Sequence, residues 1–138
     1  MKRNLLVALC LVFLAGCVTT KGYEKYALGN RLKSNILRID MTKNEVLAHF
    51  GDKKYGKLMN PYKVETYSPS DNSLIVVFFY YTHNSDKIPS DVFFKFSHDV
   101  NVTDDDLTPV IFKDGKVIGW GHSFYEAQKL AKEWKSKQ

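Results

Sequence analysis

Glycine and proline are scarce in this chain. Its 138 residues include 8 Gly and 4 Pro, and the charged residues, 25% of the total, are spread along the sequence. This composition excludes collagen-like, low-complexity and wholly disordered chains. The chain is also too short for a large enzyme fold such as a TIM barrel, which needs about 200 residues or more. We therefore expect one globular domain.

Long apolar runs are absent too. The run from Leu5 to Ala15 is well short of the about 20 residues that span a membrane. It follows the basic start Met1–Asn4 and is followed by small residues, which is the layout of a secretory signal peptide. Its end, Leu14-Ala15-Gly16-Cys17, resembles the bacterial lipobox. That resemblance implies cleavage between Gly16 and Cys17 and diacylation of the Cys17 sulfur.

The lipobox divides the chain into three parts. We expect a cleaved signal peptide over residues 1–16, a lipidated tether over 17–22 that needs no structure, and a single periplasmic domain over 23–138. The sorting rule of Gram-negative lipoproteins, as the resemblance implies it, keeps proteins with Asp after the acylated cysteine in the inner membrane. Val18 at that position is compatible with the outer membrane. The alternative is an ordinary signal peptide that contains Cys17 by chance.

Cleavage changes the charge and the cysteine content. Removing Lys2 and Arg3 lowers the formal net charge from +5 to +3, and no basic cluster lies on a recognisable nucleic-acid motif. Cys10 leaves with the signal peptide, so Cys17 is the one cysteine of the mature chain. We therefore expect membrane lipid as a partner, no nucleic acid, no intrachain disulfide and no Cys-ligated metal.

Three segments have helical patterns. Apolar spacing from Tyr23 to Leu37 predicts a helix that lies mostly after Gly29. The capping box Thr42-Lys43-Asn44-Glu45 predicts a helix over 43–50, ended by Gly51. A second capping box, Ser123-Phe124-Tyr125-Glu126, predicts a C-terminal amphipathic helix. The expected buried residues are Val46, Leu47 and Phe50 on the middle helix, and Tyr125, Ala127, Leu130, Ala131 and Trp134 on the last.

The strand patterns lie between the second and third helices. The run Leu74–Tyr81 does not alternate, which predicts a central strand covered on both faces. The alternation of Tyr62, Val64 and Thr66 with Lys63, Glu65 and Tyr67 predicts a half-exposed strand. Residues 107–112 and 116–120 flank Asp114-Gly115, which predicts a hairpin with a type I′ turn. A further strand is expected over 92–96, with loops over 83–90 and 99–106.

This order of elements predicts an α+β fold. We expect two N-terminal helices packed on one face of a small antiparallel sheet of three to five strands, with a C-terminal amphipathic helix.

Two stretches resemble families of small lipoproteins. Residues 35–47 with Phe50-Gly51 resemble the "I…G-M-T…E-V…L-G" segment of the SmpA/OmlA, or BamE-like, outer-membrane lipoproteins. Residues 107–121 resemble the "T-P-L-V-F-x-x-G-K-L-x-G-W-G" hairpin of small lipoproteins of the DUF3192 type. Asp40 replaces the Gly of the first pattern, and Asp enters the left-handed region more readily than most residues. The resemblance implies a helix-helix-strand-strand-strand core and a non-catalytic accessory role in β-barrel assembly.

Chemistry-bearing motifs are scarce. The four histidines have no H-x-x-x-H or H-E-x-x-H spacing. A metal site built from His83, His98 and Asp99 stays open as an alternative. The segment from Asp99 begins like a calcium loop but has Asp104 and Val110 where Gly and Glu are required. Ser123 beside His122 lacks the G-x-S-x-G context of a nucleophile. We expect no catalytic residue, no metal and no cofactor.

Aromatic residues are more abundant than one face of a small sheet needs. We expect most to be core residues, but an exposed subset would mark a docking surface. The candidates are Phe93, Phe94, Tyr80 and Tyr81. The leading hypothesis is therefore a lipid-anchored periplasmic accessory of envelope or outer-membrane protein assembly. The alternatives are a small-ligand or metal-binding lipoprotein and an inhibitor of a secreted or host enzyme.

Overall fold

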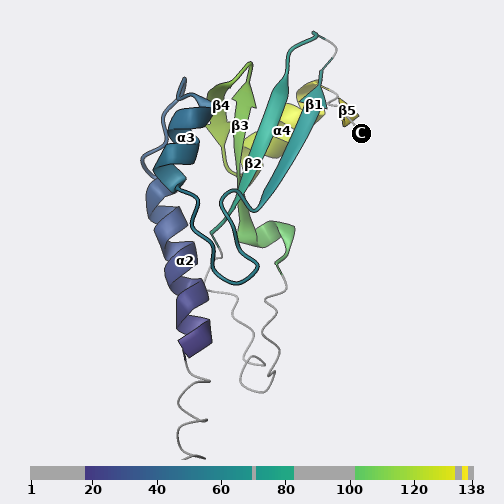
Figure 1. Cartoon of the computed structure of the whole chain (residues 1–138). Coiled ribbons are helices and arrows are strands. Elements are labelled where there is room, and N and C mark those ends of the chain that lie inside the picture. The colour runs from purple at the N-terminus through teal and green to yellow at the C-terminus, as the bar shows by residue number, and fades with distance from the viewer. Residues whose placement is uncertain (1–17, 70, 83–101, 133–134, 137–138) are drawn as a thin grey trace, which may run out of the picture.

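The structure is a computed structural model, which describes residues 18–69, 71–82, 102–132 and 135–136. In chain order its elements are α2 (Val18–Ser34), α3 (Lys43–Phe50), β1 (Lys63–Ser68), β2 (Ile75–Tyr81), the 3₁₀ turn η3 (Asp104–Asp106), β3 (Leu107–Lys113), β4 (Lys116–Trp120), α4 (His122–Lys132) and the short β5 (Lys135–Ser136) (Figure 1). The expected α+β class is confirmed. The strand predicted over 92–96 and the loop over 83–90 lie outside the described residues.

The strands form one antiparallel sheet in the order β4-β3-β2-β1-β5. All seven residues of the central strand β2 are buried, as its unbroken apolar run predicts. The predicted hairpin is confirmed as β3–β4. Its turn residues Asp114 and Gly115 have φ values of 50° and 85°, the two left-handed positions of a type I′ turn.

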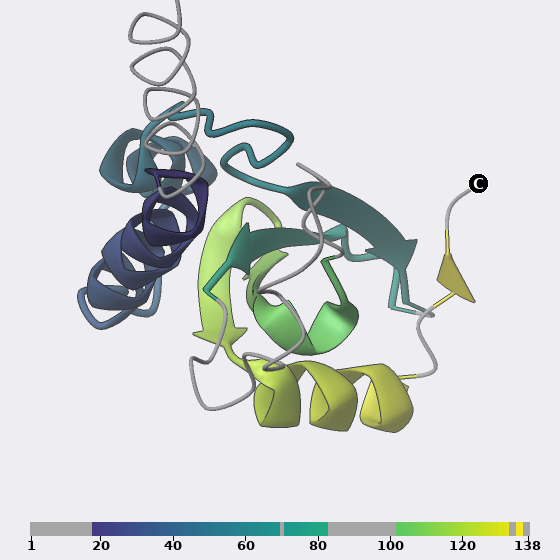
Figure 2. The same cartoon turned by 90° about the horizontal axis from the view of Figure 1, so that it is seen from below.

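Helices cover both faces of the sheet, as the unbroken run of β2 indicates, so the expectation that the helices pack on one face is wrong. On one face Val46 and Phe50 of α3 pack against Val76, Phe78 and Tyr80 of β2. On the other face Tyr125 of α4 joins the cluster that holds the alternate residues of β2 (Ile75, Val77, Phe79 and Tyr81). Figure 2 shows α4 along one side of the sheet, away from α2 and α3. Because successive strand residues point to opposite faces, two covered faces bury the whole of β2.

Helix α2 begins earlier than the sequence predicts. It is helical from Val18, the first described residue, inside the segment expected to be a tether that needs no structure, and it runs through Gly29 without a break. Ala27 and Asn30 are buried on either side of that glycine, and the Asn30 side chain donates a hydrogen bond to the Tyr81 carbonyl oxygen at 2.9 Å. Tertiary packing thus overrides the low helix propensity of Gly29.

Helix α3 matches its prediction at both ends. The Thr42 hydroxyl accepts a hydrogen bond from the Glu45 amide at 3.2 Å, and the Thr42 amide donates to the Glu45 carboxylate at 2.7 Å. Gly51 ends the helix with φ 72°. Val46 and Phe50 are buried as expected, but Leu47 is exposed.

Helix α4 differs from its prediction in its first residue and its buried face. It starts at His122, and the Tyr125 amide donates to the Gly121 carbonyl oxygen at 3.0 Å, so Ser123 lies in the first turn and does not cap the helix. Leu130, expected on the apolar side, is 79% exposed. It follows Tyr125 by five residues, which is about 140° around a helix, so the two side chains cannot share a face.

In strand β1 the buried face is the one that holds Tyr67, whereas the alternation suggested the face that holds Val64. Tyr67 is buried and Val64 is exposed. The Tyr67 hydroxyl lies 2.8 Å from the Tyr125 hydroxyl of α4. Because α4 covers this face of the sheet, Tyr67 is buried and Val64, on the other face, is exposed.

Candidate functional site

The predicted aromatic docking surface is only partly within the described residues. Tyr80 and Tyr81 are buried core residues, so their assignment to an interaction surface is wrong. Phe93 and Phe94 lie outside the described residues, as do the lipobox residues Gly16 and Cys17 and the metal candidates His83, His98 and Asp99.

The described histidines and Ser123 do not converge on a site. His122 bonds through Nε2 to the Leu107 carbonyl oxygen at 2.5 Å, and His49 lies 3.2 Å from the Lys33 carbonyl oxygen. Ser123 is exposed. Within the described ranges no group of three His, Cys, Asp or Glu side chains could hold a metal ion. Nor, in the same part of the chain, is any helix apolar and long enough to cross a membrane.

A row of exposed apolar side chains runs along α2 and just past its end. Leu28, Leu32 and Ile36 are 49%, 58% and 59% exposed, and we name these three residues the α2 row. Their four-residue spacing places Leu28 and Leu32 on one face of the helix, with Ile36 following in the turn after Ser34. Sequence reasoning placed Leu32 and Ile36 among the apolar positions of a helix but did not separate them from Ala27, which is buried on the opposite face.

A polar network fixes the opposite face of α2 to the domain. Tyr26 donates a hydrogen bond to the Asn60 side chain at 2.9 Å, and Asn30 donates to the same oxygen at 3.0 Å. Asn30 also bonds Tyr81, as described above, so α2, the loop before β1 and the end of β2 are joined. Burial raises the pKa of Tyr26 to about 12, so its hydroxyl stays protonated as a donor at neutral pH. The network prevents α2 from turning the α2 row inward.

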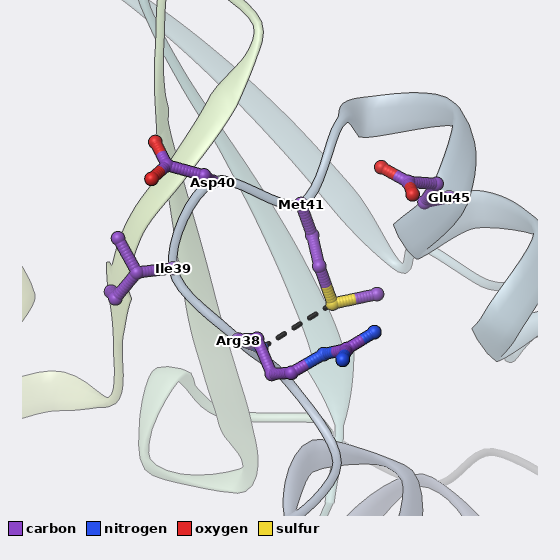
Figure 3. A pocket seen from close by; sticks show the side chains of 5 residues that line it. All are labelled: Arg38, Ile39, Asp40, Met41 and Glu45. Carbon is purple, nitrogen blue, oxygen red and sulfur yellow. Dashed lines mark hydrogen bonds between the residues drawn. The ribbon is translucent and has the colours of Figure 1, made fainter.

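A shallow pocket of about 250 Å³ lies between the α2–α3 connection and the start of α3. It is lined by Arg38, Ile39, Asp40, Met41 and Glu45 (Figure 3). The Arg38 amide lies 3.3 Å from the Met41 sulfur, the contact that the dashed line marks. Hydrogen bonds from Thr42 hold the pKa of Glu45 below its usual range, and the Arg38 charge adds to this effect. The pocket therefore combines one cation, two anions and two apolar side chains.

The connection that lines this pocket is held against the outer edge of β4. The Asp40 amide donates to the Val117 carbonyl oxygen at 2.9 Å, and the Val117 amide donates to the Met41 carbonyl oxygen at 2.8 Å. Asp40 has φ 68°, the left-handed conformation that the resemblance to a Gly-containing pattern predicts. The sequence thus singled out Asp40 as a residue able to take the place of glycine, but it did not reveal the pocket.

A second polar cluster lies between β1 and α4. The Glu65 carboxylate accepts hydrogen bonds from the Tyr67 hydroxyl and, at 3.0 Å, from the Tyr125 hydroxyl, and it pairs with Lys63 at 3.0 Å. Lys63 also pairs with Asp104 at 3.2 Å. Burial raises the pKa of Glu65, but the hydrogen bonds from Tyr67, Lys63 and Tyr125 outweigh it and leave that pKa below its usual value. The carboxylate is fully engaged by its neighbours, so the cluster joins α4 to the sheet.

These features define a small α+β domain with exposed apolar and mixed-charge surfaces. The chain belongs to a family described as "Protein of unknown function (DUF3192)", whose model matches residues 8–127. The DUF3192 part of the resemblance is thereby confirmed. No curated protein and no solved structure matches the chain.

Proposed function

We propose that this protein is a lipid-anchored, periplasm-facing accessory module of the outer membrane that acts by binding envelope proteins and not by catalysis. The observation that carries the proposal is the position of the lipobox. It reads Leu14-Ala15-Gly16-Cys17, stands behind a basic start and a short apolar run, and directly precedes the described domain, which is helical from Val18. The family match over residues 8–127 includes the lipobox, which supports treating it as part of the family's pattern.

The pocket supports the accessory role. Its residues 38–41 and Glu45 belong to the stretch that resembles the SmpA/OmlA, or BamE-like, lipoproteins. Pockets for drug-sized ligands commonly measure about 300–1,000 Å³. This one is smaller, and apart from the half-buried Met41 its lining residues are exposed. It is the size for one apolar or basic side chain of a partner protein, with Ile39 and Met41 offering apolar contact and Asp40 and Glu45 offering charge.

The anchor is tested by substituting each cysteine in turn. Cys17→Ser should abolish incorporation of labelled palmitate and release the protein from membranes or leave it uncleaved. Cys10→Ser, a change within the expected signal peptide, is the matched control and should be acylated like the wild type. Two or three acyl chains bind a bilayer far more firmly than one, because each buried CH₂ contributes about 0.8 kcal/mol. A wild-type protein without acyl groups contradicts the proposal, and density-gradient fractionation reports whether the outer membrane holds it.

The binding role is tested at the pocket. Ile39→Asp places a charge on an exposed apolar wall and should reduce crosslinking to outer-membrane proteins by tenfold or more, equivalent to about 1.4 kcal/mol. Leu130→Asp, at an even more exposed position on α4, is the matched control and should leave crosslinking unchanged. Equal capture by both variants contradicts the assignment of the pocket to partner binding.

A further inference from the structure

We infer that α2 lies on the periplasmic leaflet of the membrane, with the α2 row in contact with phospholipid. This inference rests on the proposed lipid anchor and extends it, because it assigns the anchored domain a second, non-covalent contact with the bilayer and a fixed orientation.

The row has the position that a membrane contact requires. Its three side chains are about half exposed or more, whereas Ala27 and Asn30 on the opposite face of α2 are buried. The hydrogen bonds of Tyr26 and Asn30 hold that opposite face against the domain. The row therefore points outward as part of a rigid body, and no rotation of α2 within the described fold could bury it.

The distance to the anchor favours lipid as the occupant of this face. The chain is helical from Val18, the residue after Cys17 and the first that the structure describes, so no described non-helical residue separates α2 from the anchor. At 1.5 Å per residue, the 17 residues of α2 span about 25 Å. Leu28 follows Val18, the first described residue of α2, by ten residues, so the row begins about 15 Å along the helix from the residue next to the anchor. When α2 lies flat on the bilayer, the row is therefore near enough to the anchor to contact the same leaflet.

The charge of α2 agrees with a lipid surface. The helix carries Lys21, Lys25, Arg31 and Lys33 against one acidic residue, Glu24. The Lys33 ammonium donates to the Phe50 carbonyl oxygen at 2.6 Å and so lies toward α3, which leaves Lys25 as the described exposed cation of the helix. Lys25 is exposed and precedes Leu28 by three residues, so it lies near the row on the helix surface. Apolar side chains flanked by basic ones bind the boundary between head groups and acyl chains, and anionic lipids strengthen the contact.

Depth-sensitive labelling of the full-length acylated protein tests this arrangement. Apart from Cys17, whose sulfur carries the anchor, the mature chain has no cysteine, so a single introduced cysteine can be labelled selectively. Leu32→Cys carries an NBD fluorophore in vesicles of phosphatidylethanolamine and phosphatidylglycerol. Glu126→Cys, at an exposed site on α4, is the matched control. We expect a blue-shifted emission at position 32 and quenching by acyl-chain nitroxide lipids about twofold or more above that at position 126.

A second variant checks that the row itself makes the contact. In a chain with Leu28→Ser, Leu32→Ser and Ile36→Ser, an NBD label at Lys25→Cys should lose its lipid quenching although the anchor is intact. These three positions are exposed, so the substitutions leave the core untouched, and circular dichroism verifies the fold.

The outcomes separate the two proposals. Mass spectrometry of the Cys17 peptide reports acylation independently of the label. An unacylated Cys17 overturns the anchor and the lipid contact together. An acylated protein whose residue 32 stays in water overturns only the lipid contact. A label that is shielded from water but not quenched by the nitroxide lipids indicates that a protein or a second copy covers the row, and it also overturns the lipid assignment.

Discussion

Phe50 of α3 stacks on Tyr80 of β2, with ring centroids 3.7 Å apart and an angle of 20° between the planes. Both side chains are fully buried. The pair joins α3 to the central strand and so fixes one covered face of the sheet.

Truncating this pair on the helix side should be strongly destabilising. Phe50→Ala removes a buried aromatic ring and leaves a cavity beside Tyr80, so we expect the free energy of unfolding to fall by about 3–5 kcal/mol. Leu47→Ala, at an exposed position on the same helix, is the control and should cost about 1 kcal/mol or less. Urea denaturation measures both. Equal losses in the two variants would show that the stacking contact contributes nothing specific.

Removing only the hydroxyl of Tyr80 should have a different effect. That hydroxyl is buried and has no hydrogen-bond partner among the described residues. A buried polar group without a partner costs about 1–3 kcal/mol of desolvation, so Tyr80→Phe should leave stability unchanged or raise it. Tyr80→Ala is the control for the lost ring and should destabilise severely. A clear fall in the melting temperature of Tyr80→Phe would indicate that the hydroxyl is engaged.

Tyr80 also shows where sequence reasoning failed at the candidate site. The unbroken apolar run correctly predicted a strand covered on both faces, but the number of aromatics suggested that some must be exposed. The argument from the number of aromatic residues assumed that helices cover only one face of the sheet. Because α3 and α4 cover opposite faces, Tyr80 and Tyr81 are both buried, one on each face. Among the described strands the exposed apolar residue is Val64 of β1.

The two capping boxes show what local patterns can and cannot predict. Thr42 and Glu45 form the full reciprocal set of bonds, because the chain enters α3 in extended conformation at Thr42. Before α4 the chain turns at Gly121, with φ 88°, and the helix begins one residue before Ser123. The Ser-x-x-Glu spacing is present in both places, but the backbone path into α4 depends on the hairpin that precedes it. Sequence spacing therefore predicted that both helices exist, but it predicted the start of only one.

Asp40 offers a test of backbone strain at the pocket. It is a non-glycine residue at φ 68°, and its amide is bonded to Val117. Asp40→Val places a β-branched side chain in that conformation and should destabilise by about 1–3 kcal/mol. Asp40→Gly should be tolerated without loss, because glycine adopts positive φ readily. Thermal unfolding distinguishes the two, and similar losses in both would mean that the Asp40 side chain matters more than its backbone.

Glu65 should make the stability of the domain depend on pH in the acidic range. Burial raises the pKa of this carboxyl, but hydrogen bonds from Tyr67, Lys63 and Tyr125 outweigh it and leave the pKa below its ordinary value of 4.5. A group whose pKa is lowered in the folded state stabilises that state above its unfolded pKa. The contribution is lost as the pH falls through the folded pKa, so the relevant window begins near pH 4.5 and extends below it.

The comparison with Glu65→Gln isolates this contribution. Glutamine keeps the shape of the side chain but cannot carry the charge. At pH 7 we therefore expect the variant to be less stable by about 1.5–3 kcal/mol, the contribution of a hydrogen bond to a charged group. The difference should shrink as the pH falls below 4, because the wild-type carboxyl then takes up a proton and loses its advantage. Glu126→Gln, at an exposed position on α4, is the control for substitution alone and should stay close to the wild type at both pH values. Urea denaturation at pH 7, 4 and 3 gives the three differences, and a gap between wild type and Glu65→Gln that does not change with pH would show that the charge of Glu65 does not hold α4 to the sheet.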